Sequence, residues 1–455
     1  MENDKLYDFV KGKSVAVIGI GISNRPLIEY LAKNNIDVTA CDKRDREALG
    51  NVYDEMLKMG VKLRLGEDYP KEFNEDIIFK TPGMRFDAPE LEAARKKGKC
   101  VTSEMEVFFD ICPSKIIAVT GSDGKTTTTT LISKMLNEAG YKTWLGGNIG
   151  TPLLCRACEM KKDDIVVLEL SSFQLHTMKK SPHIAVITNI TPNHLDMHKS
   201  YGEYIDAKKN IMRYQSHDDI LVFNEGNKET KKIGALSKAE VRSFSAKCNA
   251  FIKLLDGSIY YGNEKVLDIS KIKIPGMHNV ENYMAAIGAV HDFVGKAAIQ
   301  KVAAEFGGVE HRLEFVREKD GVKYYNSSID SSPNRTINAL SVFSDKVILI
   351  AGGKDKGIGY EAIGEPIEKK VKVLILIGAT SDKISDAVEK NARDKNIKST
   401  VKILRAKSYE EAVTLAKENA KYGDNVILSP ASTSFDLFKN FEERGNLFKK
   451  IVNEL

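Results

Sequence analysis

The chain has 455 residues, of which 42% are hydrophobic and 29% charged, and it contains 33 Gly and 12 Pro. These values lie near the average for globular proteins, so the composition excludes a disordered chain, a collagen and a coiled coil. Lys and Arg (68) exceed Asp and Glu (63) by a net +5. The charges are mixed along the chain, without the clustered basic excess of a nucleic-acid binder. The length predicts about three domains.

The sequence also argues against secretion and membrane insertion. No apolar run of signal-peptide length precedes Gly12. The longest apolar runs, 15–20 and 371–377, are far shorter than the ~20 residues of a membrane-spanning helix. The six cysteines have no framework spacing, and Cys155 and Cys158 lack a second pair, so we interpret them as ordinary thiols. We therefore expect a cytoplasmic protein without membrane insertion, and a monomer.

One local pattern occurs three times along the chain. Short apolar runs end in glycines at 15–21, 116–122 and 347–353, and helical spacing follows the first two at 26–34 and 128–139. β-Branched runs bounded by Gly are typical of buried parallel strands. Strand, glycine turn and helix open a βαβ unit, so the predicted class is α/β throughout. Further strands of this kind are expected at 164–170, 184–188, 371–377 and 425–428.

The domain boundaries follow from where new units begin. The segment 107–113 closes the first unit, because a fresh strand starts at Ile116. A second boundary is expected near Gly307 and Gly308. Residues 220–275 alternate short apolar runs with turns and predict a β-rich stretch. The turns predicted within this stretch are Asp256-Gly257 and Gly262-Asn263. The two boundaries together predict three domains, 1–111, 112–309 and 310–455.

The strongest local motif is Thr120–Thr127, which reads TGSDGKTT. Gly121 and Gly124 allow backbone N–H groups to approach a phosphate. Lys125 adds a cation, and Thr126 adds a hydroxyl that can ligate Mg²⁺. This is the shorter GxxGK[ST] form, without the first glycine of the usual Walker A motif. The alternative, a glycine-rich turn with a surface lysine, explains less, since strand, glycines, Lys-Thr and helix all agree.

Two further segments contain candidate metal ligands. Glu169 ends an otherwise apolar strand, and a buried carboxylate is costly unless it is paired or bound to metal. We interpret it as a metal ligand, with a plain salt bridge as the alternative. The motif His194-Leu-Asp196-Met-His198 could indicate a zinc hydrolase, but no further His cluster in the sequence completes such a site. His194 is therefore the better candidate for supporting a nucleotide's metal.

The first glycine turn is ambiguous by itself. Gly19-Ile-Gly21-Ile-Ser-Asn24 resembles a dinucleotide fingerprint, but Asn24 occupies the position of the third glycine. Asp42 follows Gly21 at about the ~20 residues expected for a ribose-binding acid. These residues alone leave a nicotinamide dinucleotide site open.

Together these segments resemble the Mur ligase family of ATP-dependent amide-forming ligases in peptidoglycan precursor synthesis. The match covers nearly the whole chain in the same order, which makes it far more specific than any single loop. The run 428–445 resembles the branch of the family that adds D-glutamate. The segments that carry the likeness are 120–127, 169–174, 188–196, 276–282 and 311–312.

The resemblance implies three domains, a Rossmann-like UDP-binding domain, a central P-loop ATPase-like domain and a Rossmann-like C-terminal domain. It implies that UDP-substrate contacts come from Ser23, Asp42, Lys43, Thr81, Pro82, Gly83, Asn148 and Gln174. ATP contacts are expected from Gly121, Ser122, Asp123, Gly124, Lys125, Thr126, Thr127, Asn279, Asn282, Arg312 and Asp330, with the two asparagines at the adenine. The implied ligands of two Mg²⁺ ions are Thr126, Glu169, His194 and Lys208, and the implied D-glutamate contacts are Lys356, Ser434, Phe435 and Phe441. The implied catalytic residues are Lys125, His194, Lys208 and Arg312.

Two positions need comment. Lys208 matches the family lysine that CO₂ carbamylates, a reaction that requires a neutral, desolvated amine. By its sequence alone, a lysine beside Lys209 on a helix would be solvated surface. Ser327 stands after Asn326, where the family commonly has a ribose-binding Asp. Asp330, three residues on, is the candidate replacement, and weaker nucleotide binding is the alternative.

The implied reaction is ATP-driven ligation of D-glutamate to UDP-N-acetylmuramoyl-L-alanine through an acyl phosphate, giving ADP and phosphate. Three alternatives remain: a sibling ligase that adds L-alanine, a diamino acid or a dipeptide, a folylpolyglutamate synthetase, and a nucleotide-gated regulatory binder. The run Ser434–Gly445 argues against a sibling, and the N-terminal module of about 110 residues argues against the synthetase. The regulatory binder would bind ATP without substrate-dependent turnover.

Overall fold

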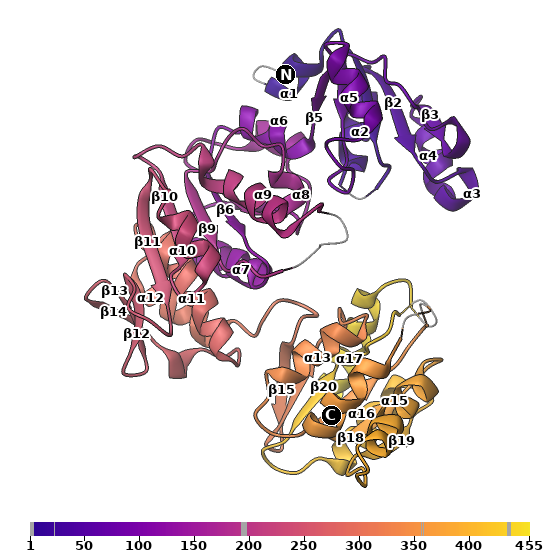
Figure 1. Ribbon diagram of the computed structural model, residues 1–455, viewed down its shortest axis with the longest axis vertical. Helices are drawn as coiled ribbons and strands as arrows, with labels where there is room; N and C mark the ends of the chain where they lie inside the picture. Colours follow the sequence, from indigo (N-terminus) through magenta and orange to yellow (C-terminus); the bar gives the residue numbers. More distant parts are fainter. Residues whose placement is uncertain (1–3, 22, 193–197, 356, 358, 435–437) are drawn as a thin grey trace. The chain divides into compact units, whose positions relative to one another are not determined.

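The computed structural model describes residues 4–21, 23–192, 198–355, 357, 359–434 and 438–455. Within these residues the strands form three sheets, and strands alternate with helices along much of the chain (Figure 1). The chain divides into two compact units, 1–271 with 280–302 and 272–279 with 303–455. The first unit contains the first two sheets and the second contains the third. The predicted α/β class is confirmed.

The N-terminal sheet has five parallel strands in the order β3-β2-β1-β4-β5. Its central strand β1 lies between β2 and β4, so the chain leaves it in opposite directions and creates a switch point at its carboxyl end. Ligands of open α/β sheets bind at such points. The strands are β1 Ser14–Ile18, β2 Asp37–Asp42, β3 Lys62–Leu65, β4 Ile77–Phe79 and β5 Cys100–Thr102. The helices are α1 Lys5–Val10, α2 Arg25–Lys33, α3 Arg46–Leu49, α4 Asn51–Lys58, α5 Pro89–Lys96 and α6 Glu104–Ile111, with the 3₁₀ turn η1 Gly66–Asp68.

The middle sheet has nine strands in the order β14-β13-β12-β11-β10-β9-β6-β8-β7. Its central strand β6 pairs with β8 and β9, and every residue of β8 is buried. The strands are β6 Lys115–Thr120, β7 Thr143–Gly147, β8 Ile165–Glu169, β9 Ile184–Ile187, β10 Ile220–Asn224, β11 Glu240–Ser245, β12 Ile252–Leu255, β13 Ser258–Tyr261 and β14 Glu264–Asp268. The helices are α7 Lys125–Glu138, α8 Ser172–Leu175, α9 Tyr201–Arg213, α10 Lys228–Gly234, α11 Met277–Val290 and α12 Lys296–Glu305, with η2 Leu154–Glu159 and η3 Ile269–Lys271.

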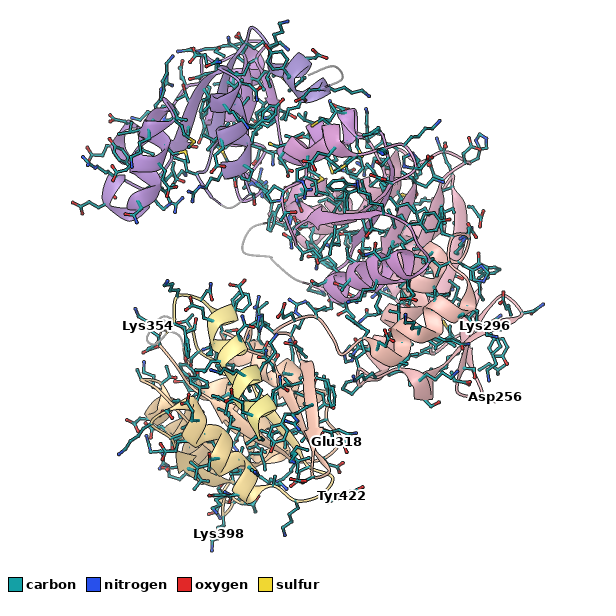
Figure 2. All side chains as sticks on the ribbon, turned by 180° about the vertical axis from the view of Figure 1, so that it is seen from behind. Asp256, Lys296, Glu318, Lys354, Lys398 and Tyr422 are labelled. Atoms are coloured by element: carbon teal, nitrogen blue, oxygen red, sulfur yellow. The ribbon has the colours of Figure 1, made fainter. Side chains whose placement is uncertain are left out.

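The β-rich stretch forms the predicted hairpins at one edge of this sheet. β12, β13 and β14 pair antiparallel, whereas the strands from β7 to β12 pair in parallel. The turn between β12 and β13 is Asp256-Gly257, and both residues have positive φ, +47° and +70°. This backbone matches a two-residue type I′ turn, which twists with the flanking strands. Asp256 lies at the outer end of the hairpin in Figure 2.

The C-terminal sheet has six strands in the order β15-β16-β20-β17-β18-β19. Among the strands described here, only the β15–β16 pair is antiparallel, and β17 is buried along its whole length. The strands are β15 Glu314–Lys319, β16 Val322–Asn326, β17 Val347–Ala351, β18 Val371–Leu376, β19 Lys402–Arg405 and β20 Asn425–Leu428. The helices are α13 Pro333–Ser341, α14 Gly364–Lys370, α15 Ser381–Asp394, α16 Tyr409–Asn419 and α17 Phe441–Glu454, with η4 Glu361–Ile363.

Two features of the chain bear on its chemistry. All six cysteines have free thiols, including Cys155 and Cys158. In the part of the chain that the structure describes, no helix has both the length and the hydropathy needed to cross a bilayer.

The central position of β17 makes a stability prediction. Ile350 is fully buried between β18 and β20, whereas Ile397 is 46% exposed. We expect Ile350→Ala to lower the free energy of unfolding of the C-terminal unit by about 2–5 kcal/mol, because it leaves a cavity in the core. Ile397→Ala should change it by less than about 0.5 kcal/mol. Urea denaturation followed by circular dichroism measures both, and equal costs would contradict the placement of β17.

Candidate active site

The glycine turn after β6 has the conformation that the sequence motif requires. Gly121 and Gly124 have φ of +154° and +78°, and Gly124 caps the N-terminus of α7. A Cβ on Gly121 would collide with the Thr188 hydroxyl, and one on Gly124 would collide with the Asn282 side-chain oxygen. L-Residues rarely adopt such φ values, so backbone and surroundings both select glycine here. The loop therefore approaches its neighbours as closely as a phosphate-binding turn must.

Lys125 and Thr126 begin the helix after this turn. Lys125 folds back, and its Nζ donates to the carbonyl oxygens of Gly121 at 3.0 Å and Ser122 at 2.9 Å. Thr126 Oγ1 donates to Oε2 of Glu169 at 2.7 Å, and Asn148 Nδ2 donates to Oε1 of the same carboxylate at 2.8 Å. Glu169 is only 2% exposed. The structure thus joins two predicted metal ligands, Thr126 and Glu169, and one predicted substrate contact.

The oxygen atoms gathered here fit a magnesium ion bound to nucleotide phosphates. Mg²⁺ prefers hard oxygen ligands and usually takes one or two carboxylates together with phosphate oxygens and water. The Thr126 hydroxyl and the buried Glu169 carboxylate match that preference. Within the described ranges, no three His, Cys, Asp or Glu side chains cluster as a metal site of their own. His194 and Asp196 lie outside the described residues.

Lys208 lies beside the same turn. It is carried by α9, is 1% exposed, and its Nζ donates to the Gly121 carbonyl at 2.8 Å and to Thr120 Oγ1 at 3.3 Å. Burial lowers the pKa of Lys208 well below its usual range, and the positive charge of nearby Lys125 lowers it further. The negative charges of Glu169 and Asp123 raise this pKa but do not outweigh burial. A desolvated amine next to a phosphate-binding loop is the environment that carbamylation requires.

The predicted adenine contacts lie on α11. Thr128 Oγ1 donates to Asn282 Oδ1 at 3.3 Å, which brings Asn282 to the start of α7. Asn279 lies one turn earlier on α11, and its Nδ2 donates to the Pro275 carbonyl at 2.6 Å. The structure therefore places Asn282 against the phosphate loop.

The predicted UDP-substrate residues line two cavities of the first unit. The larger, about 580 Å³, includes Asp42, Lys43, Thr81 and Gly83, which lie at or just after the carboxyl ends of β2 and β4. The smaller, about 130 Å³, includes Ser23, Pro82, Asn148 and Gln174. All eight predicted residues are thus distributed over these two cavities.

Hydrogen bonds and an ion pair hold the Asp42 carboxylate in place in the larger cavity. Its Oδ2 accepts from the Ile20 N–H at 2.8 Å, and Arg44 forms an ion pair with it. Burial opposes ionisation, but hydrogen bonds from Arg44 and Ile20 hold the pKa of Asp42 below its usual value. The carboxylate is therefore ionised and fixed at neutral pH. Asn24, the residue that departs from the dinucleotide fingerprint, donates from Nδ2 to the Ile18 carbonyl at 2.8 Å and closes the turn after β1.

The remaining predicted residues belong to the second unit. Asp330 is 6% exposed and accepts from Ser429 Oγ at 2.8 Å, and burial raises its pKa. Ser434 is buried, and its carbonyl accepts from the N–H of Phe438 at 2.9 Å. Phe441 begins α17, and Arg312 follows His311, whose φ is +61°. Lys356 and Phe435 lie outside the described residues.

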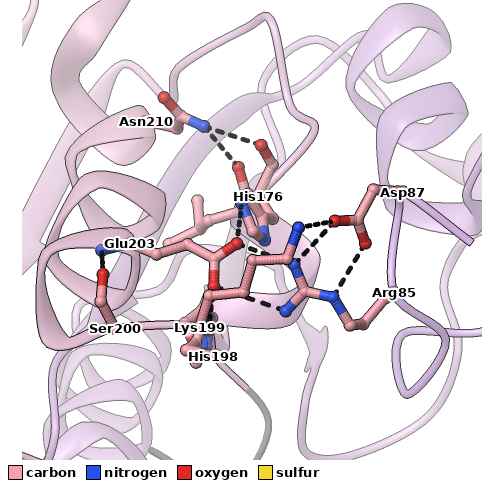
Figure 3. A network of polar contacts seen from close by, with 10 residues as sticks. Arg85, Asp87, His176, His198, Lys199, Ser200, Glu203 and Asn210 are labelled. Carbon is pink, nitrogen blue, oxygen red and sulfur yellow. Dashed lines mark hydrogen bonds and ion pairs between the residues drawn. The ribbon is translucent and has the colours of Figure 1, made fainter.

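A charged network that the sequence reasoning missed connects the larger cavity to α9 (Figure 3). Arg85 Nη2 donates to Glu203 Oε1 at 2.8 Å, and its Nε donates to Asp87 Oδ1 at 2.8 Å. Lys199 donates from its N–H to Glu203 and from Nζ to Asp87, each at 2.5 Å. Arg85, Asp87 and Lys199 also line the 580 Å³ cavity. Residues that line the larger cavity are thereby tied to the helix that carries Lys208.

No local signal in the sequence could have found this network. Arg85 and Glu203 are separated by 118 residues. The local sequence around each of them indicates only an exposed charged residue. The Glu203 carboxylate, which pairs with Arg85, accepts from the backbone N–H of Lys199 and has 18% side-chain exposure, gains these partners only once the chain has folded.

Three domain families match the chain in the order of its three sheets. They are the Mur ligase MurD-like N-terminal domain over residues 13–103, the Mur ligase middle domain over 119–290 and the Mur ligase glutamate ligase domain over 311–432. The chain belongs to the Mur ligase family, and the likeness noted in its sequence is confirmed.

Full-length relatives show which branch of the family the chain resembles. A protein of Ruminiclostridium cellulolyticum named UDP-N-acetylmuramoylalanine--D-glutamate ligase is 54% identical over 463 residues, covering 100% of both chains. The protein of that name from Acetivibrio thermocellus is 55% identical over 464 residues, covering 100% of this chain and 99% of its own. The crystal structure of the UDP-N-acetylmuramate-alanine ligase of Thermotoga maritima has a TM-score of 0.60 at 18% identity, covering 97% of this chain and 99% of that one. This likeness supports the fold.

The collision at Gly124 yields a binding prediction with a matched control. Gly124→Ala and Gly140→Ala both place an alanine at positive φ, +78° and +90°, at opposite ends of α7. Only the first meets another side chain, that of Asn282, while nothing lies near the second. Both should destabilise by about 1 kcal/mol or more, but only Gly124→Ala should abolish ATP binding in calorimetry. Retained ATP binding by Gly124→Ala would refute the role of this turn.

The network predicts a pH-dependent stability difference. Hydrogen bonds from Arg85 lower the pKa of Glu203 from 4.5 to about 2. A depressed pKa stabilises the folded state above the unfolded value, and the gain is lost as pH falls from about 4.5 to 2. We expect Glu203→Gln to cost about 1–2 kcal/mol at pH 7, and the difference from the unsubstituted protein to shrink below pH 4.5.

The control for this prediction is Glu159→Gln, which removes an ion pair with Arg156 whose side chains are about half exposed, 46% and 49%. Exposed pairs contribute little, so its unfolding midpoint should match that of the unsubstituted protein at every pH. A Glu203→Gln variant that is as stable as this control at pH 7 would show that the network does not stabilise the fold.

Proposed function

We propose that the chain catalyses the ATP-dependent ligation of D-glutamate to UDP-N-acetylmuramoyl-L-alanine, with ADP and phosphate as the other products. The observation that carries this proposal is the full-length match, at 54% and 55% identity, to relatives named for that reaction. Four predicted ATP-site residues lie around one glycine turn, namely Lys125, Thr126, Glu169 and Lys208. This arrangement supports ATP as the energy source.

We propose that the segments 1–111, 112–309 and 310–455 act as three domains. The first, together with Asn148 and Gln174, binds the nucleotide sugar, and its two cavities support that role. The second binds ATP through the turn 121–127 and Asn282. The third binds D-glutamate through Lys356, Ser434, Phe435 and Phe441, with Arg312 neutralising phosphate charge. Asp330 is the proposed ribose contact, and in the structure its carboxylate accepts a hydrogen bond from Ser429 Oγ.

Magnesium fits the oxygen ligands that the chain supplies. Thr126, Glu169 and His194 would hold it, together with Lys208 once carbamylated. When bound, it would offset the negative charge of the triphosphate. The buried amine of Lys208 supports the carbamate, since CO₂ reacts only with the uncharged form.

The chemistry follows from the substrates. A carboxylate oxygen of the L-alanine residue attacks the γ-phosphorus of ATP, the bond to the β-phosphate oxygen breaks, and ADP leaves. The D-glutamate amine then attacks the acyl phosphate carbonyl, loses a proton, and phosphate departs as the amide forms. Lys125 and Arg312 stabilise charge on the transferring group, the main task in phosphoryl transfer. The nucleophiles come from the substrates, so the mechanism needs no Ser or Cys nucleophile.

Phosphate release tests the proposal. The protein, ATP, Mg²⁺ and UDP-N-acetylmuramoyl-L-alanine should release phosphate when D-glutamate is added, and should release little with L-glutamate, L-alanine or a diamino acid. Release with another amino acid alone would assign a sibling ligase. ATP binding without substrate-dependent turnover would favour a regulatory binder.

Lys208 has a neighbouring lysine that serves as control. Lys208→Ala should lower the rate by about 10²–10³, because it removes a group that stabilises charge in the transition state. Short carboxylates such as acetate should restore part of that rate by replacing the carbamate. Lys209→Ala, at a partly exposed position, should remain active. Equal activity of both variants, measured by phosphate release, would exclude a role for Lys208.

A further inference from the structure

His198, the second histidine of the motif 194–198, is buried although the proposed reaction gives it no role. It is 4% exposed and lies just before α9. Its Nε2 and the Oγ of Ser172 are 2.9 Å apart and share a hydrogen bond. Ser172 is the first residue of α8, the short helix that follows Glu169 and contains Gln174. His198 therefore connects the segment before α9 to the helix after β8.

The imidazole ring lies against two aromatic side chains. It is stacked on Phe173, with ring centroids 5.0 Å apart and an angle of 7° between the planes. It meets Tyr204 of α9 edge to face, with centroids 5.3 Å apart and an angle of 72°. Both are preferred geometries for pairs of aromatic rings. The His198 ring thus packs Tyr204 against α8.

A hydroxyl and a carboxylate fix the orientation of this ring. The Nδ1 of His198 lies 3.7 Å from Oε2 of Glu203, and the Ser172 hydroxyl lies at Nε2. The same Glu203 carboxylate accepts from Arg85 and from the backbone N–H of Lys199 (Figure 3). A rotation of the ring would therefore break a contact at one of its two nitrogens.

Tyr204 extends from the His198 ring to the phosphate loop and to Lys208. Tyr204 is 1% exposed, and its hydroxyl oxygen is 2.9 Å from Ser122 Oγ in the loop. The Nζ of Lys208 lies over the Tyr204 ring, 4.8 Å from its centroid. Tyr204 and Lys208 are four residues apart on α9 and therefore share one helix face. The ring of Tyr204 and the carbonyl of Gly121 both contact the amine that is expected to react with CO₂.

We propose that His198 is a positioning residue for the carbamylation of Lys208, because its ring holds Tyr204 in place and Tyr204 holds the amine at the phosphate loop. The inference rests on the proposed function, which takes Lys208 to be carbamylated. In that step the uncharged Nζ attacks the carbon of CO₂. An N–C bond forms, one C–O π bond opens to give the carboxylate, and Nζ loses a proton to solvent. His198 acts on this step through Tyr204.

Carbon-13 NMR of the full chain equilibrated with labelled bicarbonate tests this proposal, because it detects the carbamate itself. The unsubstituted protein should show a carbamate resonance that Lys208→Ala lacks. His198→Ala removes the ring that holds Tyr204 and should lose most of this resonance. His217→Ala is the matched control, since the His217 side chain is 87% exposed, and it should keep the full resonance.

Kinetics provide a second readout that a purely structural role would not give. His198→Ala should lower kcat by about 10- to 100-fold, since a shift of about 1 Å in a catalytic group can cost about 10²-fold. The KM values for ATP, the nucleotide sugar and D-glutamate should stay unchanged. In the Lys208→Ala background the same substitution should add no further loss, because residues that act through one group are not additive. A role in folding alone would add a loss in both backgrounds.

Two further variants separate the ring from the hydrogen bond. His198→Phe keeps a ring beside Tyr204 and loses the bond to Ser172, whereas His198→Gln can keep that bond but has no ring. The Phe variant should retain more of the carbamate resonance and a higher kcat than the Gln variant. This comparison gives the result even if His198→Ala does not fold.

The outcomes distinguish this inference from the proposed function. A full carbamate resonance in His198→Ala, or equal losses in the Phe and Gln variants, would overturn the role of His198 alone. A missing resonance in the unsubstituted protein would overturn the proposed carbamate and this inference together.

Discussion

A buried carboxylate at the end of β8 holds the first unit's two binding regions together. Glu169 accepts from Thr126 of the phosphate loop through one oxygen and from Asn148 of the smaller cavity through the other. Burying an unpaired carboxylate would cost several kcal/mol, and these two hydrogen bonds offset that cost only while both partners stay in place. These two hydrogen bonds therefore fix the loop relative to the smaller cavity.

In each of the three sheets, candidate site residues lie at the carboxyl ends of parallel strands. Asp42 ends β2 and Lys80 follows β4, the glycine turn and Glu169 lie at the ends of β6 and β8, and the segment containing Ser434 follows β20. Parallel pairing brings carboxyl ends together, so residues far apart in sequence meet at one edge. Insertions and substitutions in these turns can change the ligand without changing the sheet.

Buried charges distinguish the site from an ordinary core. Lys208 and Lys80 carry nearly inaccessible amines whose pKa values burial lowers, the first against a carbonyl of the phosphate loop and the second in a cavity lined by polar groups. The Arg85–Glu203 pair spans the N-terminal and middle sheets of the first unit and restrains α9, which carries Lys208. Such groups reduce stability unless they are paired.

Local patterns in the sequence were sufficient for the α/β class, the strand–turn–helix units, the glycine turns and the hairpin at Asp256-Gly257, because a buried strand and a tight turn each have a short-range signature. Full-length resemblance then predicted ligand-binding residues. Of these, the eight predicted for the nucleotide sugar line two cavities, and Lys125, Thr126, Glu169 and Lys208 lie around the glycine turn after β6. Lys80, Arg85 and Glu203 could not be found this way. Each is a single charged residue in a polar stretch, and whether it is solvated or buried depends on partners up to 118 residues away. Only the tertiary structure decides that, since burial and pairing are properties of the packed chain.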